Sequence, residues 1–146
     1  MYKSIFASKS TIILSILILG LMTTLIIEAS QPPLPILGKV NNLDKVAHFS
    51  AYSCLSILIC ALYLKISTKE RIPLFSAPLL ITSVYGLIEE IYQSFVPSRS
   101  ASVYDLLADI SGAIFAIFIA NIISKFIHKQ NNNNTRIGRY LIVFIK

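Results

Sequence analysis

The chain has 146 residues, of which 55% are hydrophobic and only 14% are charged. Soluble domains carry about 25% charged residues, so this composition predicts a membrane protein and leaves no room for a separate soluble domain beside several spans. The formal net charge of +6 is therefore interpreted through the position of the basic residues relative to the membrane, and no nucleic-acid partner is expected.

Four apolar runs divide the chain, separated by polar or proline-containing segments. A spanning helix needs ~20 predominantly apolar residues, so we predict an all-α integral membrane bundle of four transmembrane helices. The predicted organisation is a cytoplasmic N-terminus (1–9), helix one (10–28), an outer loop (29–43), a core (44–126) with helices 44–65, 74–96 and 103–126, and a flexible cytoplasmic tail (127–146).

The first apolar run, from Thr11 to Ile27, has two interpretations. A signal peptide has an apolar stretch of 7–15 residues followed by a small-residue cleavage site. This run is longer, and Ile27 and Glu28 precede the small residue Ala29, which fits such a site poorly. We expect a retained first span, with cleavage as the alternative.

Cys54 and Cys60 lie six residues apart in one apolar run, so on a helix they face different directions. We expect both to act as small apolar residues. The sequence has no CxxC or Cys/His ligand spacing, so a structural zinc site is not predicted.

The basic residues gather on one side of the predicted spans. An even number of spans places both termini on one side. That side, with the 65–72 loop, holds ten of the thirteen Lys and Arg residues and one acid, Glu70. The opposite side holds three basic residues and six acids. By the positive-inside rule we expect a multi-pass cell-membrane protein with both termini in the cytoplasm.

This orientation brings three polar helix ends together on the outer side. Glu90 lies about six residues before the turn at Pro97, and Asp109 lies about as far after Ser102, so both are roughly 10 Å below the helix ends at ~1.5 Å per residue. We therefore predict a polar layer between the second, third and fourth helices. Its expected members are His48, Glu90, Gln93, Asp105 and Asp109, with Arg99 in the turn above.

Helix periodicity assigns faces to these residues. Positions spaced by three or four share a face, which groups Asp44 with His48 and Glu90 with Gln93. Glu89 is expected on another face, either paired with Lys45 or directed to the outer surface.

Two further local patterns concern the fourth helix. Ser102 and Asp105 have the spacing of a capping box at its start. Gly112 and Ala116 form a small-xxx-small pair that permits close approach of another helix.

Polar residues between spanning helices often serve only to hold the helices together. Four carboxylates, a histidine and an arginine exceed what packing needs, so we favour a functional cavity. The predicted catalytic residues are His48, Glu90, Asp105 and Asp109, and the predicted ligand-binding residues are Asp44, Lys45, Gln93 and Arg99.

Three segments resemble the motifs of the VanZ-like family of small bacterial membrane proteins. They are Asp44-Lys45-x-x-His48-Phe49-x-x-Tyr52, Glu90-x-x-Gln93-x-Phe95-x-Pro97-x-Arg99 and Asp105-Leu106-Leu107-Ala108-Asp109-x-x-Gly112. The chain departs from the family at Tyr92, Ser98 and Asp109, where relatives often carry His, Gly and Asn. The resemblance implies a cell-membrane protein with an envelope role, since the family is named after a protein that gives low-level teicoplanin resistance.

The favoured function is the binding or modification of a polar or phosphorylated, lipid-linked or cell-wall component. Arg99 and Lys45 would meet an anion, and His48 would form an acid/base pair with a carboxylate. The partners expected are the lipid bilayer and this anionic ligand.

Three alternatives stay open. A metal-assisted enzyme would use His48 with carboxylates, but a single histidine in the layer disfavours it, so no metal site and no cofactor are predicted. A structural or accessory protein would use the polar layer only to assemble the helices. Transport is disfavoured because the polar residues do not continue across the membrane.

Overall fold

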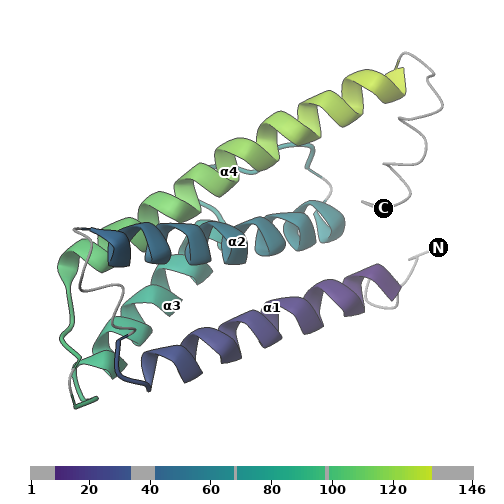
Figure 1. Ribbon diagram of the computed structural model, residues 1–146. Coiled ribbons are helices and arrows are strands. Elements are labelled where there is room, and N and C mark those ends of the chain that lie inside the picture. Colours follow the sequence, from purple (N-terminus) through teal and green to yellow (C-terminus); the bar gives the residue numbers. More distant parts are fainter. Residues whose placement is uncertain (1–8, 34–41, 68, 98, 133–146) are drawn as a thin grey trace.

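The computed structural model describes residues 9–33, 42–67, 69–97 and 99–132, and all regular structure in these residues is helical (Figure 1). The four helices are α1 (Lys9–Ala29), α2 (Leu43–Ile66), α3 (Ala77–Gln93) and α4 (Val103–Asn132). The predicted all-α fold with four helices is confirmed.

The ends of α3 and α4 differ from the predicted bounds. α3 begins at Ala77 rather than at 74, after Ser76 and with Pro78 in its first turn, where a missing N–H costs no helical hydrogen bond. It ends at Gln93 rather than at 96, because the N–H groups of Phe95 and Val96 bond to carbonyls three residues back and tighten the chain into a turn.

α4 continues to Asn132, six residues beyond the predicted end at 126. The first part of the predicted flexible tail is therefore helical, and the remainder of that tail lies outside the described residues.

Three helices are long and apolar enough to cross a membrane: α1, α2 and the stretch Val103–Lys129 of α4. α3 has 17 residues and is thus about 25 Å long, somewhat shorter than the ~30 Å hydrocarbon core. Large apolar side chains on the outer faces stay exposed, among them Ile16, Leu80 and Phe118, as expected for a surface in contact with lipid.

The central helix is α2, which packs against α1, α3 and α4, and its contact with α4 is the most extensive in the bundle. At Gly112 the two backbones lie so close that a Cβ atom would be 2.5 Å from the carbonyl oxygen of Phe49. The hydroxyl groups of Ser53 and Ser56 donate across this interface to the carbonyls of Gly112 and Ala113. The close approach predicted from Gly112 is confirmed.

Successive helices run in opposite directions, so the end of α1, the start of α2, the end of α3 and the start of α4 lie together (left in Figure 1). This is called the site end below. The start of α1 and the ends of α2 and α4 point away from the site end, and residues 69–76, which lead into α3, lie beside α4 (Figure 1). That segment is held by the side-chain amide of Asn121, which bonds to both the N–H and the carbonyl of Ile72.

Candidate functional site

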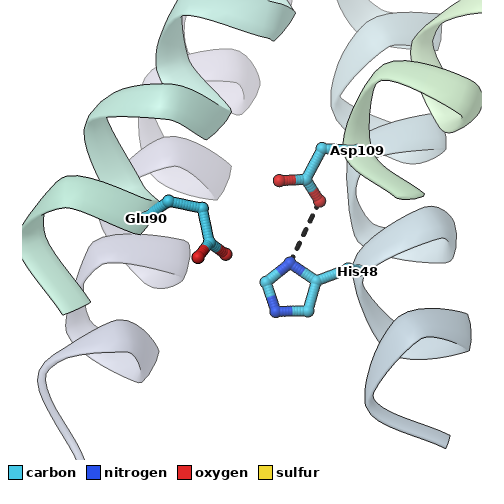
Figure 2. A group of neighbouring side chains, drawn as sticks. All are labelled: His48, Glu90 and Asp109. Carbon is cyan, nitrogen blue, oxygen red and sulfur yellow. Dashed lines mark hydrogen bonds and ion pairs between the residues drawn. The ribbon is translucent and has the colours of Figure 1, made fainter. Parts of the chain in front are cut away.

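Three helices bring His48, Glu90 and Asp109 together near the site end (Figure 2). His48 lies on α2, one turn into the helix, and its Nδ1 is 3.0 Å from Oδ1 of Asp109 on α4. Glu90 on α3 points at the same space from the opposite side. One nitrogen or oxygen from each residue lies within 4.8 Å of the others. We call His48, Glu90 and Asp109 the triad.

Two carboxylate oxygens of the triad are buried without a hydrogen-bond partner in the described part of the chain, Oε1 of Glu90 and Oδ2 of Asp109. The residues are 4% and 0% exposed. The second oxygen of Glu90 accepts a 2.7 Å hydrogen bond from the backbone N–H of Ser102. Buried acceptors without partners are rare and costly, so the triad offers these two oxygens to a ligand, an ion or ordered water.

Gly86 makes the space that the Asp109 carboxylate occupies. A Cβ atom at position 86 would lie 2.9 Å from Oδ2 of Asp109 and 3.1 Å from a ring carbon of Tyr52. A side chain at position 86 would therefore displace one of the triad oxygens.

Glu89 is buried, and the prediction that it pairs with Lys45 or faces outward is wrong. It is 2% exposed, accepts a 2.5 Å hydrogen bond from the hydroxyl of Tyr52, and accepts a second from the amide of Gln93. The physical reason is that α3 contacts both α2 and α4, so neighbouring positions 89 and 90 each face a different helix. The sequence signal was Tyr52 itself, one turn after His48 on the same face.

Lys45 is already engaged by two carboxylates. Its Nζ lies 2.6 Å from Oδ2 of Asp44 and 2.9 Å from Oδ1 of Asp105. The predicted capping box is half present: Ser102 Oγ accepts from the N–H of Asp105, but the N–H of Ser102 donates to Glu90. Asp105 is thereby free to hold Lys45, and it does not take part in the triad.

Arg99 bonds to the end of α1 and not to the polar layer. Its guanidinium donates to Oε1 and the carbonyl oxygen of Glu28, at 2.7 and 2.9 Å, and to the carbonyl of Gln31 at 2.8 Å. From the sequence, Arg99 is expected to meet an anionic ligand, and Glu28 is not considered as its partner. The signal for Glu28 in the sequence was its position as a lone acid at the end of the first apolar run.

The predicted site residues thus separate into four groups. His48, Glu90 and Asp109 form the triad, Asp44, Lys45 and Asp105 form an ion-pair cluster nearer the helix starts, Gln93 lies beside Glu89, and Arg99 lies beside the end of α1. The two cations of the site end that the structure describes, Lys45 and Arg99, have carboxylate partners. The acids outnumber the cations, so the triad favours a positively charged or hydrogen-donating group. With Asp109 orienting its ring, His48 is also placed to act as an acid/base.

The comparison with protein families adds to this geometry. A family model described as VanZ/LLP1 matches residues 32–124, well over half of the chain. The chain belongs to the VanZ/LLP1 family. The match includes the whole triad, the ion-pair cluster and Arg99, whereas Glu28 and Gln31, which hold Arg99, precede it. Searches of curated proteins and of solved structures gave no match.

Proposed function

We propose that this VanZ/LLP1 protein acts in the cell envelope, where its triad binds or modifies the polar head group of a lipid-linked or cell-wall component. The observation that carries the proposal is the His48–Asp109 pair facing Glu90, with two buried acceptor oxygens that no described group satisfies. A contact that serves only to join helices does not need unsatisfied acceptors, since each of them costs stability.

The distribution of charge supports an outer position for the triad. The part of the bundle away from the site end carries the basic residues of the described chain outside the site, among them Lys65, Lys69, Arg71, Lys125 and Lys129. The site end carries six of the seven acids. Under the positive-inside rule the basic end faces the cytoplasm, both termini lie there, and the triad faces the outer leaflet.

The chemistry of the pair supports a role beyond binding. In the tautomer with its proton on Nδ1, His48 donates a hydrogen bond to Asp109. This bond fixes the ring and leaves Nε2 for a proton transfer. Lys45 and Arg99 are already paired, so an anionic head group needs a further positive charge at the site or must displace one of these partners.

A complementation experiment tests the proposal. A strain lacking the protein is supplied with wild type, His48→Ala, Glu90→Gln or Ser111→Ala, and the strains are compared for growth in teicoplanin and in other cell-wall antibiotics. Ser111 is a matched control, because it is exposed on α4 and its hydroxyl bonds only to the carbonyl of Leu107. We expect the two triad variants to behave like the deletion at normal membrane levels, and Ser111→Ala to behave like wild type. Triad variants that restore the wild-type phenotype contradict the proposal.

A structural or accessory role is the second candidate, favoured by the contacts that join helices at the same end. Tyr52 to Glu89 links α2 to α3, and Lys45 to Asp105 links α2 to α4. Under this role, activity in the triad variants falls only as far as the amount of folded protein falls. Measuring both quantities in the same membranes therefore separates the two candidates.

A further inference from the structure

We propose that His48, Glu90 and Asp109 bind one divalent transition-metal ion of the Zn²⁺ or Mn²⁺ type. The inference deepens the proposed function and rests on it for its biological meaning, because the ion would supply the positive charge that an anionic head group lacks at this site. With the ion bound, His48 would serve as its ligand in place of the acid/base role. The binding itself is measured without that head group.

The geometry of the triad suits a small cation. Each residue contributes one ligand atom, and these atoms lie within 4.8 Å of one another. Bonds of about 2.0–2.2 Å to imidazole nitrogen and carboxylate oxygen place ligand atoms roughly 3 to 4 Å apart. Small changes in the side-chain χ angles of these residues would bring the ligand atoms to that separation.

The unsatisfied oxygens are the second, independent observation. In the described residues, the buried carboxylate oxygens without a hydrogen-bond partner are Oε1 of Glu90 and Oδ2 of Asp109, one from each acid of the triad. Both oxygens of Glu89, only one position away, have partners within the protein. Among the carboxylates of the described residues, buried oxygens without a hydrogen-bond partner therefore occur only in the triad.

The charges around the triad lead to the same conclusion. Among the described residues, the titratable groups near the triad carboxylates are Glu89, Asp105, Lys45 and the His48 ring. Lys45 is held by Asp44 and Asp105, so it does not neutralise Glu90 or Asp109. Even a protonated His48 would balance only one of the two. A divalent cation would balance both, and charge buried without balance is strongly unfavourable.

The ligand set points to the class of ion. One imidazole with two carboxylates suits Zn²⁺ and Mn²⁺, whereas Mg²⁺ and Ca²⁺ prefer oxygen alone. Three protein ligands leave further coordination positions, as in catalytic rather than structural zinc sites. A phosphate oxygen of a head group would fit such a position.

The test measures metal content in the full-length protein, purified in detergent with the affinity tag removed. After chelator treatment the protein is loaded with Zn²⁺ or Mn²⁺ and passed through gel filtration, and the metal per chain is measured by elemental analysis. Mn²⁺ is also titrated by electron paramagnetic resonance, because Cys54 and Cys60 thiols compete less for this harder ion.

Matched variants locate the ion. Wild type is expected to retain one ion per chain, and Glu90→Gln and Asp109→Asn are expected to bind at least ~10-fold more weakly. Glu89→Gln is the control at the neighbouring buried carboxylate, and His128→Ala is the control for the second histidine, which lies near the other end of α4. Both controls are expected to retain the ion. Helix content by circular dichroism is checked for each variant, and His48→Gln replaces His48→Ala where the latter does not fold.

Two results overturn the inference. In the first, folded wild type retains no ion, which would leave ordered water as the partner of these oxygens. In the second, wild type and the triad variants retain the ion equally. Failure of the metal site and failure of the proposed function can be told apart. If the triad variants lose the ion but still restore the envelope phenotype, the proposed function is contradicted and the metal site is not. If the protein binds no ion but the envelope phenotype still depends on the triad, the metal site is contradicted and the proposed function is not.

Discussion

Gly112 on α4 lies directly against Phe49 on α2, so that a Cβ atom at position 112 would be 2.5 Å from the Phe49 carbonyl oxygen. The same Cβ atom would lie 3.0 Å from Oγ of Ser53. This contact sets the separation of α2 and α4. Gly112 follows Asp109 by three residues on α4, and Phe49 follows His48 directly on α2. The spacing of the helices therefore controls the His48–Asp109 contact.

Gly112→Ala is predicted to destabilise the bundle. The added methyl group meets backbone atoms, which cannot move aside as a flexible side chain can, and overpacking of this kind costs about 1–3 kcal/mol. Thermal unfolding in detergent should show a lower midpoint. Gly20→Ala is the control, since nothing lies within 4 Å of a Cβ there and the change favours the helix by up to about 1 kcal/mol. A Gly112→Ala protein as stable as Gly20→Ala contradicts the observed helix contact.

Tyr52→Phe is predicted to cost about 1–3 kcal/mol of unfolding free energy, because it leaves a buried oxygen of Glu89 without its donor. The loss should be smaller in a Glu89→Gln background, where the oxygen left behind belongs to a neutral amide. Chemical denaturation of the four proteins of this cycle measures the coupling. Tyr104→Phe, at a position 72% exposed, is expected to change little. Equal losses in both backgrounds would show that Tyr52 and Glu89 are not coupled.

Arg99→Lys is predicted to loosen the last turn of α1 while changing global stability little. A lysine keeps the charge but lacks the planar fork that reaches Glu28 and Gln31 together. The ion pair alone is worth less than about 1 kcal/mol, since Glu28 is 43% exposed. Hydrogen exchange should therefore become faster at the N–H groups of Ser30 and Gln31.

Glu28→Gln serves as the control for Arg99→Lys, because it removes the charge and keeps both carbonyl acceptors. We expect a smaller increase in exchange for this variant. Unchanged exchange in Arg99→Lys would show that the arginine does not hold the end of α1.

Orientation is tested with single cysteines in a background carrying Cys54→Ser and Cys60→Ser. Ser100→Cys lies in the turn at the site end and Lys69→Cys in the segment between α2 and α3, and both positions are exposed. In intact cells a membrane-impermeant maleimide should label Ser100→Cys, and Lys69→Cys should be labelled only after permeabilisation. The reverse pattern would place the triad on the cytoplasmic side.

The positions of the helices and the common depth of the three triad residues could be predicted from the sequence, because both follow from the pattern of residues along the chain. Apolar runs bounded by prolines define the helices, and in an up-and-down bundle the depths of His48, Glu90 and Asp109 follow from a count of residues. Small residues at Gly112 and Ala116 likewise indicated which face of α4 packs closely.

The partners of Glu89 and Arg99 could not be predicted because they depend on how the helices are rotated and placed. A burial pattern on α3 cannot say that position 89 faces Tyr52 while position 90 faces Ser102. Nor does the sequence say that the end of α1 lies beside the turn that carries Arg99. Arg99 is paired with Glu28, and Lys45 with Asp44 and Asp105, so neither is the free cation that the sequence predicts for an anionic ligand.

The central claim is that the triad is a metal-ion site and not only a contact between helices, and nuclear magnetic resonance of His48 tests it most directly. The chain has two histidines, so ¹⁵N-histidine labelling with His128→Gln leaves the imidazole of His48 as the only labelled ring. On addition of Zn²⁺ in nanodiscs, we predict that the His48 ring nitrogens shift strongly in this protein and not when Glu90→Gln is added. A His48 signal that is unchanged by Zn²⁺, or that shifts equally with Glu90→Gln, would contradict the claim.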